Sequence, residues 1–534
     1  MTWSFCPTAW TSDMHLIGID VGTGSARAGV FDAQGVLKGA ASQEVVLWKG
    51  PGNRVEQSSD DIWSAVCTAV REAVKAAGVD PASIGGIGVD ATCSLVILGE
   101  GGAPLPVEAD RNIIVWMDHR ATEQAARINA LGHPVLDYVG GVISPEMETP
   151  KLLWLRENAP EVYAAAWQFM DLTDFLTWKA SGDLSRSICT VTCKWTYLGH
   201  EGGWDASYFE KVGLGDLGKD GFARIGSRVV AAGTALGTGL TAEAAAQMGL
   251  PEGTPVGAGL IDAHAGGLGT VGTGGDPTGD LAYVFGTSSC TMTTTETPAF
   301  VRGVWGPYHS AMIPGMWLNE GGQSAAGAAV DQLIDHHPFA AEAHELAAAA
   351  GQSLPSWLAD QVGDGAVLER VQGVHVVPEV LGNRAPHADP HCRATIMGIG
   401  MERGLDSLLA LYLATICGLG YGLRQIIEAQ SAAGAEIARI AISGGAGRHP
   451  LIRQILADTT GKPVVAPESA EPVLLGAAML GALAGGRYED AGSAMRAMSR
   501  SGGINRPAPE AVAQHLDRYR VFKQLQAIAA TAVQ

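Results

Sequence analysis

The sequence is poor in charged side chains, and basic residues are fewer than acidic ones. Charged residues make up 17% of the 534 residues, against about 25% in an average globular protein. With 35 basic and 55 acidic residues the formal net charge is −20. We therefore expect no general binding to nucleic acid or to a membrane, because affinity for polyanions comes largely from clustered lysine and arginine. Small phosphate sites stay possible, since backbone N–H groups and a metal ion can supply the positive field.

Several short motifs of large enzyme classes are also missing. No G-x-x-x-x-G-K-[ST] occurs, which excludes a P-loop enzyme, and no G-x-S-x-G occurs, which weakens a serine hydrolase. The one G-x-G-x-x-G, at 267–272, follows no clear strand and runs into TGGDPTGD, so a dinucleotide-binding fold is disfavoured. Prolines interrupt the group His387, His391 and Cys392, so we expect no zinc site on a helix there.

Cysteine and long apolar runs are scarce as well. The eight cysteines include no CxxC pair, which favours reduced thiols and a cytoplasmic location, with Cys189 and Cys193 packing as small hydrophobes. Residues 1–14 lack a basic segment followed by an apolar one, so we interpret them as a flexible leader and not a signal peptide. The longest uncharged run lies between Asp406 and Arg424 and is expected to form a buried core helix.

Glycine, in contrast, is abundant. It accounts for 71 of 534 residues, or 13%, against about 7% in average usage. Hydrophobic residues reach 47%, enough for large cores in two to four domains. The excess glycine is therefore expected inside folded structure, at tight turns and at close approaches of the backbone to a ligand.

A glycine turn between two strands occurs once in each half of the chain. The first is Gly22–Ser25 and the second is Gly286–Ser289, both with the pattern G-T-x-S and 264 positions apart. Two residues before the first turn stands Asp20, where the second has Val284. Two phosphate-binding turns facing each other beside one carboxylate would suit a nucleoside triphosphate with Mg²⁺. Two ordinary glycine hairpins remain an equal alternative on this pattern alone.

A series of segments then resembles a known family. In order along about residues 15 to 490, the chain contains LIGIDVGTGSARAGVFD, GVDATCSLVIL, VWMDHRA, PKLLWLREN, GAGLIDAHAGGLGT, FGTSSC, GNRAPHADP and ISGGAGRHPLIRQILAD. Together these are similar to the FGGY carbohydrate kinases. The resemblance implies an α/β fold of two ribonuclease-H-like (actin-like ATPase) domains with a cleft between them. It divides the chain into an N-terminal domain at 15–270, which binds the sugar, and a C-terminal domain at 271–534, which binds ATP.

The resemblance assigns the catalytic and nucleotide-binding residues. Asp262 matches the catalytic base, and a carboxylate within hydrogen-bond reach of a sugar hydroxyl can orient it and accept its proton. An Asx turn among glycines is the structural alternative for this residue. Asp20 resembles the magnesium-linked aspartate, with Asp262 also near the metal. The implied ATP contacts are Gly22, Thr23, Gly24 and Arg27 in the first turn, Gly286, Thr287 and Ser288 in the second, and Gly444, Gly445 and Ala446 in an adenosine loop.

The implied sugar contacts are read from the ribulokinase-type members. Lys194 and Glu320 resemble their substrate-binding lysine and glutamate, and Ala91 resembles a backbone contact. Both charged residues could instead be solvated at the surface. Asp118 is expected either to face the sugar or to form an ion pair with Arg120. The segment GNRAPHADP looks most like the D-ribulokinase branch, with alanine at 385 a small departure.

These observations predict an ATP- and Mg²⁺-dependent kinase that converts D-ribulose to D-ribulose 5-phosphate. L-ribulose or another pentulose or pentitol is the alternative substrate, because epimers differ in the direction of a single hydroxyl. An actin-like ATPase switch is the alternative of a different class. We expect the sugar and ATP as partners, a hinge within residues 266–279, and a homodimer only as the habit of the family.

Overall fold

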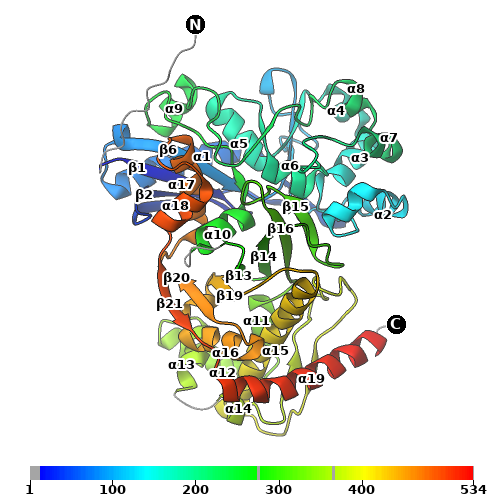
Figure 1. The fold of residues 1–534 in the computed structure, drawn as a ribbon, viewed down its shortest axis with the longest axis vertical. Helices are drawn as coiled ribbons and strands as arrows, with labels where there is room; N and C mark the ends of the chain where they lie inside the picture. Colours follow the sequence, from blue (N-terminus) through cyan, green and yellow to red (C-terminus); the bar gives the residue numbers. More distant parts are fainter. Residues whose placement is uncertain (1–12, 273–276, 364–366, 533–534) are drawn as a thin grey trace.

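The chain forms two α/β lobes, which lie one above the other along the long axis of the molecule (Figure 1). In this computed structural model the described residues are 13–272, 277–363 and 367–532. The first lobe holds a five-stranded sheet in the order β12-β6-β1-β2-β3. Its strands are β1 (His15–Val21), β2 (Ser25–Asp32), β3 (Leu37–Glu44), β6 (Ile84–Ala91) and β12 (Leu260–Ile261).

The other elements of the first lobe surround this sheet. A second sheet consists of β4 (Trp48–Gly50), β5 (Arg54–Gln57), β8 (Ile113–Ile114), β7 (Leu95–Leu98) and β9 (Gln168–Asp171), and β10 (Arg186–Ser187) pairs with β11 (Val229–Val230). The helices are α1 (Ser59–Ala77), α2 (Thr122–Ala130), α3 (Glu148–Asn158), α4 (Pro160–Ala165), α5 (Leu172–Ser181), α6 (Ile188–Lys194), α7 (Ala206–Val212), α8 (Asp216–Lys219), α9 (Ala242–Met248) and α10 (Asp262–Thr270).

The second lobe holds a seven-stranded sheet in the order β15-β16-β14-β13-β19-β20-β21. Its strands are β13 (Asp280–Phe285), β14 (Ser289–Thr295), β15 (Trp305–His309), β16 (Trp317–Gln323), β19 (Arg439–Ser443), β20 (Val464–Pro467) and β21 (Ser501–Asn505), and β17 (His375–Val377) pairs with β18 (Thr395–Met397). The helices that follow β16 are α11 (Gly327–Asp335), α12 (Ala340–Ala349), α13 (Leu354–Gln361), α14 (Val367–Arg370), α15 (Leu405–Ala432), α16 (Pro450–Thr460), α17 (Pro472–Ala484), α18 (Ala491–Met498) and α19 (Pro509–Ala532).

The two large sheets repeat one strand arrangement. β1 pairs antiparallel with β2 and parallel with β6, and β13 pairs in the same way with β14 and β19. The strand registers match: Asp20 lies opposite Asp90 on β6, and Val284 lies opposite Ser443 on β19. The sequence repeat is therefore a repeat of the fold, with two carboxylates in the first lobe where the second has valine and serine.

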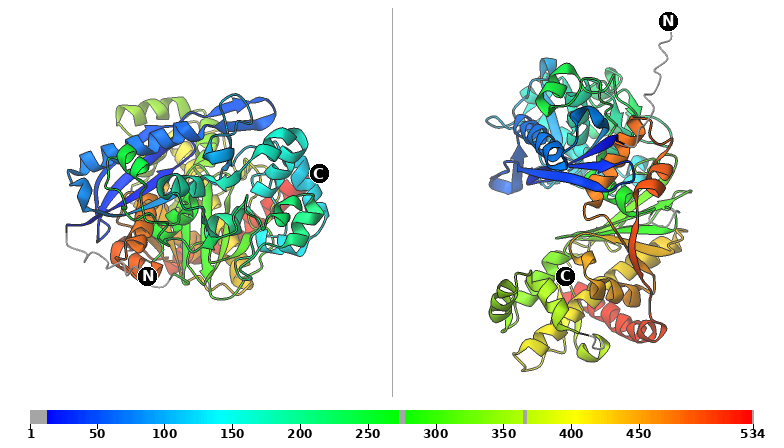
Figure 2. Two further views of the ribbon diagram at one scale, coloured as in Figure 1. Left: turned by 90° about the horizontal axis from the view of Figure 1, so that it is seen from above. Right: turned by 90° about the vertical axis from the view of Figure 1, so that its left-hand side faces the viewer.

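Two helices near the end of the chain return to the first lobe. α17 and α18 lie beside β1 and β2 in Figure 1 and in both views of Figure 2, and α17 packs against β1, β6 and α10. The division expected at residue 270 separates the two sheets in sequence, but the lobe that contains 15–270 also includes these helices. The stretch expected to hold the hinge begins inside α10, and residues 273–276 lie outside the described part.

Glycine allows this packing. A Cβ atom on Gly88 of β6 would lie 1.8 Å from the carbonyl oxygen of Ala477, and one on Gly18 of β1 would lie 1.9 Å from that of Leu474. On the helix side, a Cβ on Gly476 would lie 2.0 Å from the carbonyl oxygen of Ala265 in α10. Part of the glycine excess therefore serves contact between backbones in the core and not ligand binding.

The long apolar run forms α15, as expected, although the helix begins two residues before it and extends beyond it. An 18-residue window of this helix has a mean hydropathy of 1.4 and is 78% buried, and the helix packs against α11, α16 and β17. A core helix of this kind meets the same length and composition criteria as a membrane span.

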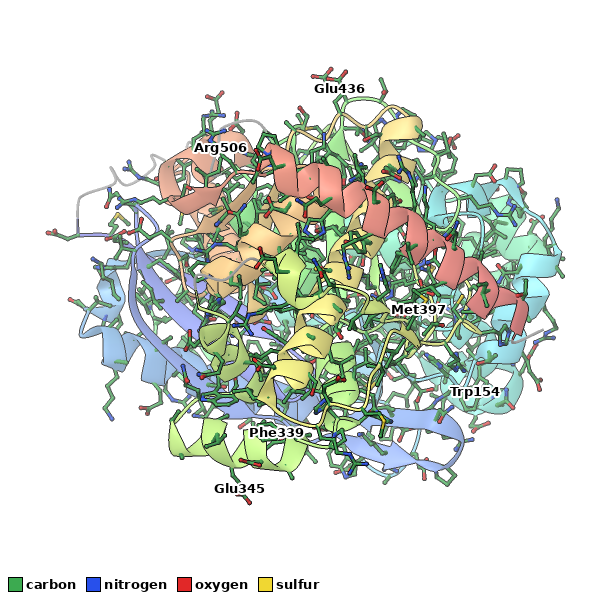
Figure 3. All side chains as sticks on the ribbon, turned by 90° about the horizontal axis from the view of Figure 1, so that it is seen from below. Trp154, Phe339, Glu345, Met397, Glu436 and Arg506 are labelled. Carbon is green, nitrogen blue, oxygen red and sulfur yellow. The ribbon has the colours of Figure 1, made fainter. Side chains whose placement is uncertain are left out.

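Figure 3, from below, shows α19 crossing the underside of the second lobe, where Arg518 donates to the carbonyls of Val371 and Val374.

Candidate active site

A cavity of about 560 Å³ lies between the lobes and receives side chains from both. Strand ends of the first sheet supply one wall, and β14, β15 and β16 of the second sheet supply the other. The polar and aromatic residues that line it are Asp20, Thr23, Ser25, Arg27, Thr92, Cys93, Trp116, Glu146, Lys194, Asp262, Ser288, Cys290, Trp305, Glu320 and Arg384. The lining therefore combines acids and bases with both glycine turns.

Asp20 and Asp262 stand at the ends of neighbouring strands. Asp20 is the sixth residue of β1, and Asp262 follows β12 directly and begins α10; the parallel pairing of both strands with β6 places these ends at one edge of the sheet. The Asp262 carboxylate accepts the N–H of Ala263 at 2.7 Å. Burial, together with the charge of Asp20, raises the pKa of Asp262 to about 6, a value suited to a general base near neutral pH.

Asp90 is a third carboxyl group at this edge, and the sequence analysis did not single it out. It lies opposite Asp20 in the register of β1 and β6 and is fully buried. Burial, with the charges of Asp20 and Asp262, raises the pKa of Asp90 well above its ordinary value. Two of the three acids face the cavity, and this is the donor set that a hard divalent cation such as Mg²⁺ prefers.

Arg27 bridges this acidic edge to the chain segment that crosses between the lobes. Its guanidinium donates to the Asp20 carboxylate and, at 2.9 Å, to Glu471 just before α17. Burial would lower the pKa of Arg27, but the neighbouring Asp20 and Glu471 raise it. Arg27 lines the cavity, as expected of a phosphate contact. In this structure its guanidinium forms ion pairs with Asp20 and Glu471.

The first glycine turn is fixed by one side chain from the second sheet of its own lobe and one from the turn that follows β8. The indole N–H of Trp116 donates to Thr23 Oγ1 at 3.0 Å, and the Gln57 side chain donates to the Thr23 carbonyl at 2.9 Å. Gly22 closes the turn by donating to the Ser25 carbonyl at 3.0 Å. Gln57 stands in none of the segments that resemble the family, and Trp116 belongs to VWMDHRA, but nothing there indicates a contact with a turn so far away along the chain.

The second turn leads into a second cavity of about 590 Å³, which lies within the C-terminal lobe. Gly286 closes the turn by donating to the Ser288 carbonyl at 2.9 Å. Ser288 lines the first cavity, whereas Gly286 and Thr287 line the second. This turn therefore joins the two cavities, which is where the phosphates of a nucleotide would lie. Other residues around the second cavity are Gly327, Asp331, Ser353, Pro355, Tyr412, Gly445, Ala446 and His449.

The predicted adenosine loop reaches this second cavity with two of its three residues. Gly445 and Ala446 line it, while Gly444 lines a neighbouring cavity. Gly444 has φ +92°, and a Cβ atom there would lie 2.3 Å from the carbonyl oxygen of Phe285, so only glycine fits at this position. Its role is to let the loop turn closely over β13.

Lys194 and Glu320 lie at the floor of the first cavity, and both are buried, with 6% and 5% of each residue exposed. Burial would raise the pKa of Glu320, but Lys194 and His264 lower it to about 2. Burial would likewise lower the pKa of Lys194, yet nearby groups, Glu320 among them, hold it well above its ordinary value. Both groups therefore keep their charges away from bulk water, and the alternative of two solvated surface residues does not apply.

Trp305, Arg384 and Glu146 are among the cavity residues that the sequence analysis missed. The Lys194 ammonium lies 5.0 Å from the centre of the Trp305 ring, and the Arg384 guanidinium lies 5.5 Å from it. Glu146 faces the same space and lies 3.3 Å from the imidazole Nε2 of His119. Arg384 belongs to the segment GNRAPHADP and could have been found there, but Trp305 and Glu146 stand in no recognisable motif.

Asp118 and Ala91 do not line the cavity. Asp118 is fully buried, accepts from the Arg120 guanidinium at 2.7 and 2.8 Å, and accepts the N–H of Val55 at 2.6 Å. The structure thus shows the ion pair with Arg120, and the expected sugar contact stays a prediction. Ala91 is the last residue of β6 and fully buried, and the residues that follow it, Thr92 and Cys93, reach the cavity instead.

The two α/β lobes, with a glycine turn from each lobe at a cavity that also holds a carboxylate edge, have the actin-like ATPase fold. Residues 15–269 match the N-terminal domain of the FGGY family of carbohydrate kinases, and residues 281–485 match its C-terminal domain. The chain therefore belongs to the FGGY family and is a carbohydrate kinase that uses a sugar and ATP.

Similar proteins are found among both sequences and solved structures. The FGGY carbohydrate kinase domain-containing protein of Danio rerio is 45% identical over 96% of this chain and 97% of its own length. A D-ribulokinase of Saccharomyces cerevisiae is 39% identical over 88% of this chain and 71% of its own. The crystal structure of xylulose kinase from Rhodospirillum rubrum has a TM-score of 0.80 at 23% identity. The match covers 97% of this chain and 99% of that one, which shows a shared fold.

Proposed function

We propose that this carbohydrate kinase transfers the terminal phosphoryl group of ATP to D-ribulose and forms D-ribulose 5-phosphate. The observation that carries the proposal is the floor of the first cavity, where Lys194 and Glu320 keep their charges beside Asp262. The 39% identity to a protein named D-ribulokinase supports the choice of sugar. A lysine ammonium can donate to ketose oxygens, and a glutamate can accept from two hydroxyls.

Asp262 is the residue that would act on the reacting hydroxyl. Its carboxylate can orient the hydroxyl and accept its proton as phosphoryl transfer proceeds. Most of the acceleration in such a reaction comes from in-line positioning and from stabilisation of charge on the phosphoryl group. The backbone of the two glycine turns and Arg27 would supply part of that stabilisation. Mg²⁺, when bound, would neutralise phosphate charge, and Asp20 and Asp262 are the residues that would hold it.

The proposal is tested by comparing sugars under matched conditions. We expect kcat/KM, measured by coupled ADP release, to be highest for D-ribulose among D-ribulose, L-ribulose, D-xylulose and the related pentitols. The Asp262→Asn variant serves as the blank, because it keeps the shape of the site but lacks the proton acceptor. A higher kcat/KM for L-ribulose would replace the proposed substrate by its alternative. Absence of turnover with every pentulose and pentitol would overturn the proposal.

A further inference from the structure

Two cysteines and a histidine meet in the core directly beneath the sugar-binding floor. Cys189 and Cys193 lie four residues apart on α6, so they share one face of the helix, and His264 lies in the first turn of α10. The Sγ atoms of Cys189 and Cys193 lie 3.1 and 4.0 Å from His264 Nδ1. All three residues are fully buried. The sequence analysis expected both cysteines to pack as small hydrophobes. Both are buried, but their sulfur atoms also lie next to Nδ1 of the His264 ring.

The spacing of these atoms suits a tetrahedral metal ion. The three ligand atoms all lie within 4.8 Å of one another. Zinc bonds of about 2.3 Å to sulfur and about 2.0 Å to nitrogen place tetrahedral neighbours roughly 3.5 to 3.8 Å apart. The two observed sulfur–nitrogen distances, 3.1 and 4.0 Å, lie on either side of this range. An ion therefore fits after shifts of about half an ångström.

The groups around the cluster are those that usually support a metal centre. The backbone N–H of Ile261 donates to Cys189 Sγ at 3.4 Å, a contact that stabilises a thiolate. The other ring nitrogen of His264, Nε2, lies 3.3 Å from Glu320 Oε2, and metal-binding histidines are commonly held by a carboxylate in this way.

We propose that Cys189, Cys193 and His264 bind one Zn²⁺ ion beneath the sugar site. Two sulfur ligands and an imidazole select zinc over Mg²⁺, which prefers oxygen ligands, so the two metals do not compete. A fourth ligand, such as a water molecule, would complete the tetrahedron. The ion joins α6, which ends at Lys194, to α10, which begins at Asp262, and fixes the ring that contacts Glu320. Its role is to hold the floor of the sugar site in place.

The metal content of the unmodified protein tests this directly. After purification under reducing conditions without chelator, elemental mass spectrometry is expected to find about one zinc per chain. Replacing the zinc by Co²⁺ is expected to produce the near-ultraviolet charge-transfer band of a cobalt–thiolate bond. Less than about a tenth of an equivalent of zinc, with no such band on adding Co²⁺, would overturn the proposal. A Cys189–Cys193 disulfide in the freshly purified protein, seen in its intact mass, would overturn it equally.

Variants test which residues are the ligands. Cys189→Ser and Cys193→Ser are each expected to lose most of the zinc, whereas Cys67→Ser, a buried cysteine of α1 outside the cluster, is expected to keep it. A strong chelator should lower the melting temperature of the unmodified protein and of Cys67→Ser, but not that of either cluster variant. Zinc retained in full by both cluster variants would overturn the assignment. If these variants fail to fold, the cobalt spectrum of the unmodified protein decides.

Discussion

The chemistry of this protein depends on a small number of charged side chains that are held away from bulk water. Lys194 and Glu320 stabilise each other's charges at the cavity floor, and Asp262 receives too little opposing charge to keep an ordinary pKa. The same burial therefore has opposite outcomes: the pKa of Glu320 falls to about 2 and that of Asp262 rises to about 6. The difference separates a carboxylate that binds from one that can exchange a proton.

Replacing Asp262 by asparagine should leave sugar binding largely intact while kcat falls by about two to four orders of magnitude. In the unmodified enzyme the ionised carboxylate is required. Because its pKa is about 6 in the ligand-free protein, kcat/KM should fall as the pH drops below that value, by roughly tenfold for each pH unit. Steady-state kinetics and calorimetric sugar binding check both expectations. If the Asp262→Asn variant retains about a tenth or more of the kcat of the unmodified enzyme, Asp262 is not the catalytic base.

Replacing Glu320 by glutamine should raise KM for the ketopentose by about tenfold or more and leave KM for ATP unchanged, since a carboxylate that accepts from two hydroxyls is lost. The folded pKa of Glu320 is lowered, so its stabilising effect is present above pH 4.5 and is lost as the pH falls toward about 2. The variant should therefore lose less stability between these pH values than the unmodified protein. Urea unfolding at several pH values measures the unfolding free energy of both proteins. An equal loss of unfolding free energy in the two proteins over this pH range would refute the prediction.

At the level of secondary-structure elements, α17 determines how closely the first lobe packs. It lies against β1 and β6 on one side and α10 on the other, and backbone atoms approach directly where Gly18, Gly88 and Gly476 lack side chains. Because α10 begins at Asp262, this packing also positions the catalytic residue. Glycines that look like ligand contacts in the sequence are here a requirement of the core.

Gly88→Ala should destabilise the fold strongly, by several kcal/mol, because its methyl group would lie 1.8 Å from the carbonyl oxygen of Ala477 and the well-packed helix cannot shift without cost. Gly203→Ala is the matched control, since nothing lies within 4 Å of its added carbon, and its unfolding free energy should change by less than about 1 kcal/mol. Chemical unfolding of both variants provides the comparison. Equal stability of the two would show that the sheet and helix can separate freely.

At the level of the whole molecule, the chain passes between the lobes more than once. It leaves the first lobe after α10 and returns to it with α17 and α18 before α19 ends on the second lobe (Figure 1). Glu471, on the returning segment, holds Arg27 of the first lobe. The cavity between the lobes is lined from both sides, so a change in the angle between them would change its width.

Binding of sugar and nucleotide together should draw the lobes closer, because an open site would let water compete for the phosphoryl group. We expect small-angle X-ray scattering to show a smaller radius of gyration with D-ribulose and a non-hydrolysable ATP analogue than without ligands. Each ligand alone serves as the control for partial closure. If calorimetry shows both ligands bound while the radius of gyration stays unchanged, the lobes act as a rigid pair.

Local patterns predicted much of the fold. The strands around Gly22 and Gly286, the strand that ends at Ala91 and the long helix after residue 404 all follow from short-range periodicity and turn residues. Among the predicted site residues, Asp20, Asp262, Lys194 and Glu320 meet in one cavity. Those that were missed, such as Trp116 and Glu146, come from loops whose place depends on contacts distant in sequence.

The repeated strand–turn–strand units, the low content of charged residues and the motifs that define the family could be read from the sequence alone, because each depends on neighbouring residues. Which acids face the cavity depends on the tertiary structure, which pairs Asp118 with Arg120 and leaves Asp262 with too little opposing charge to offset its burial. It also gathered Cys189, Cys193 and His264 at one point. The physical reason is that burial and opposing charge, which set the pKa and the ligands of a group, come from residues far away along the chain.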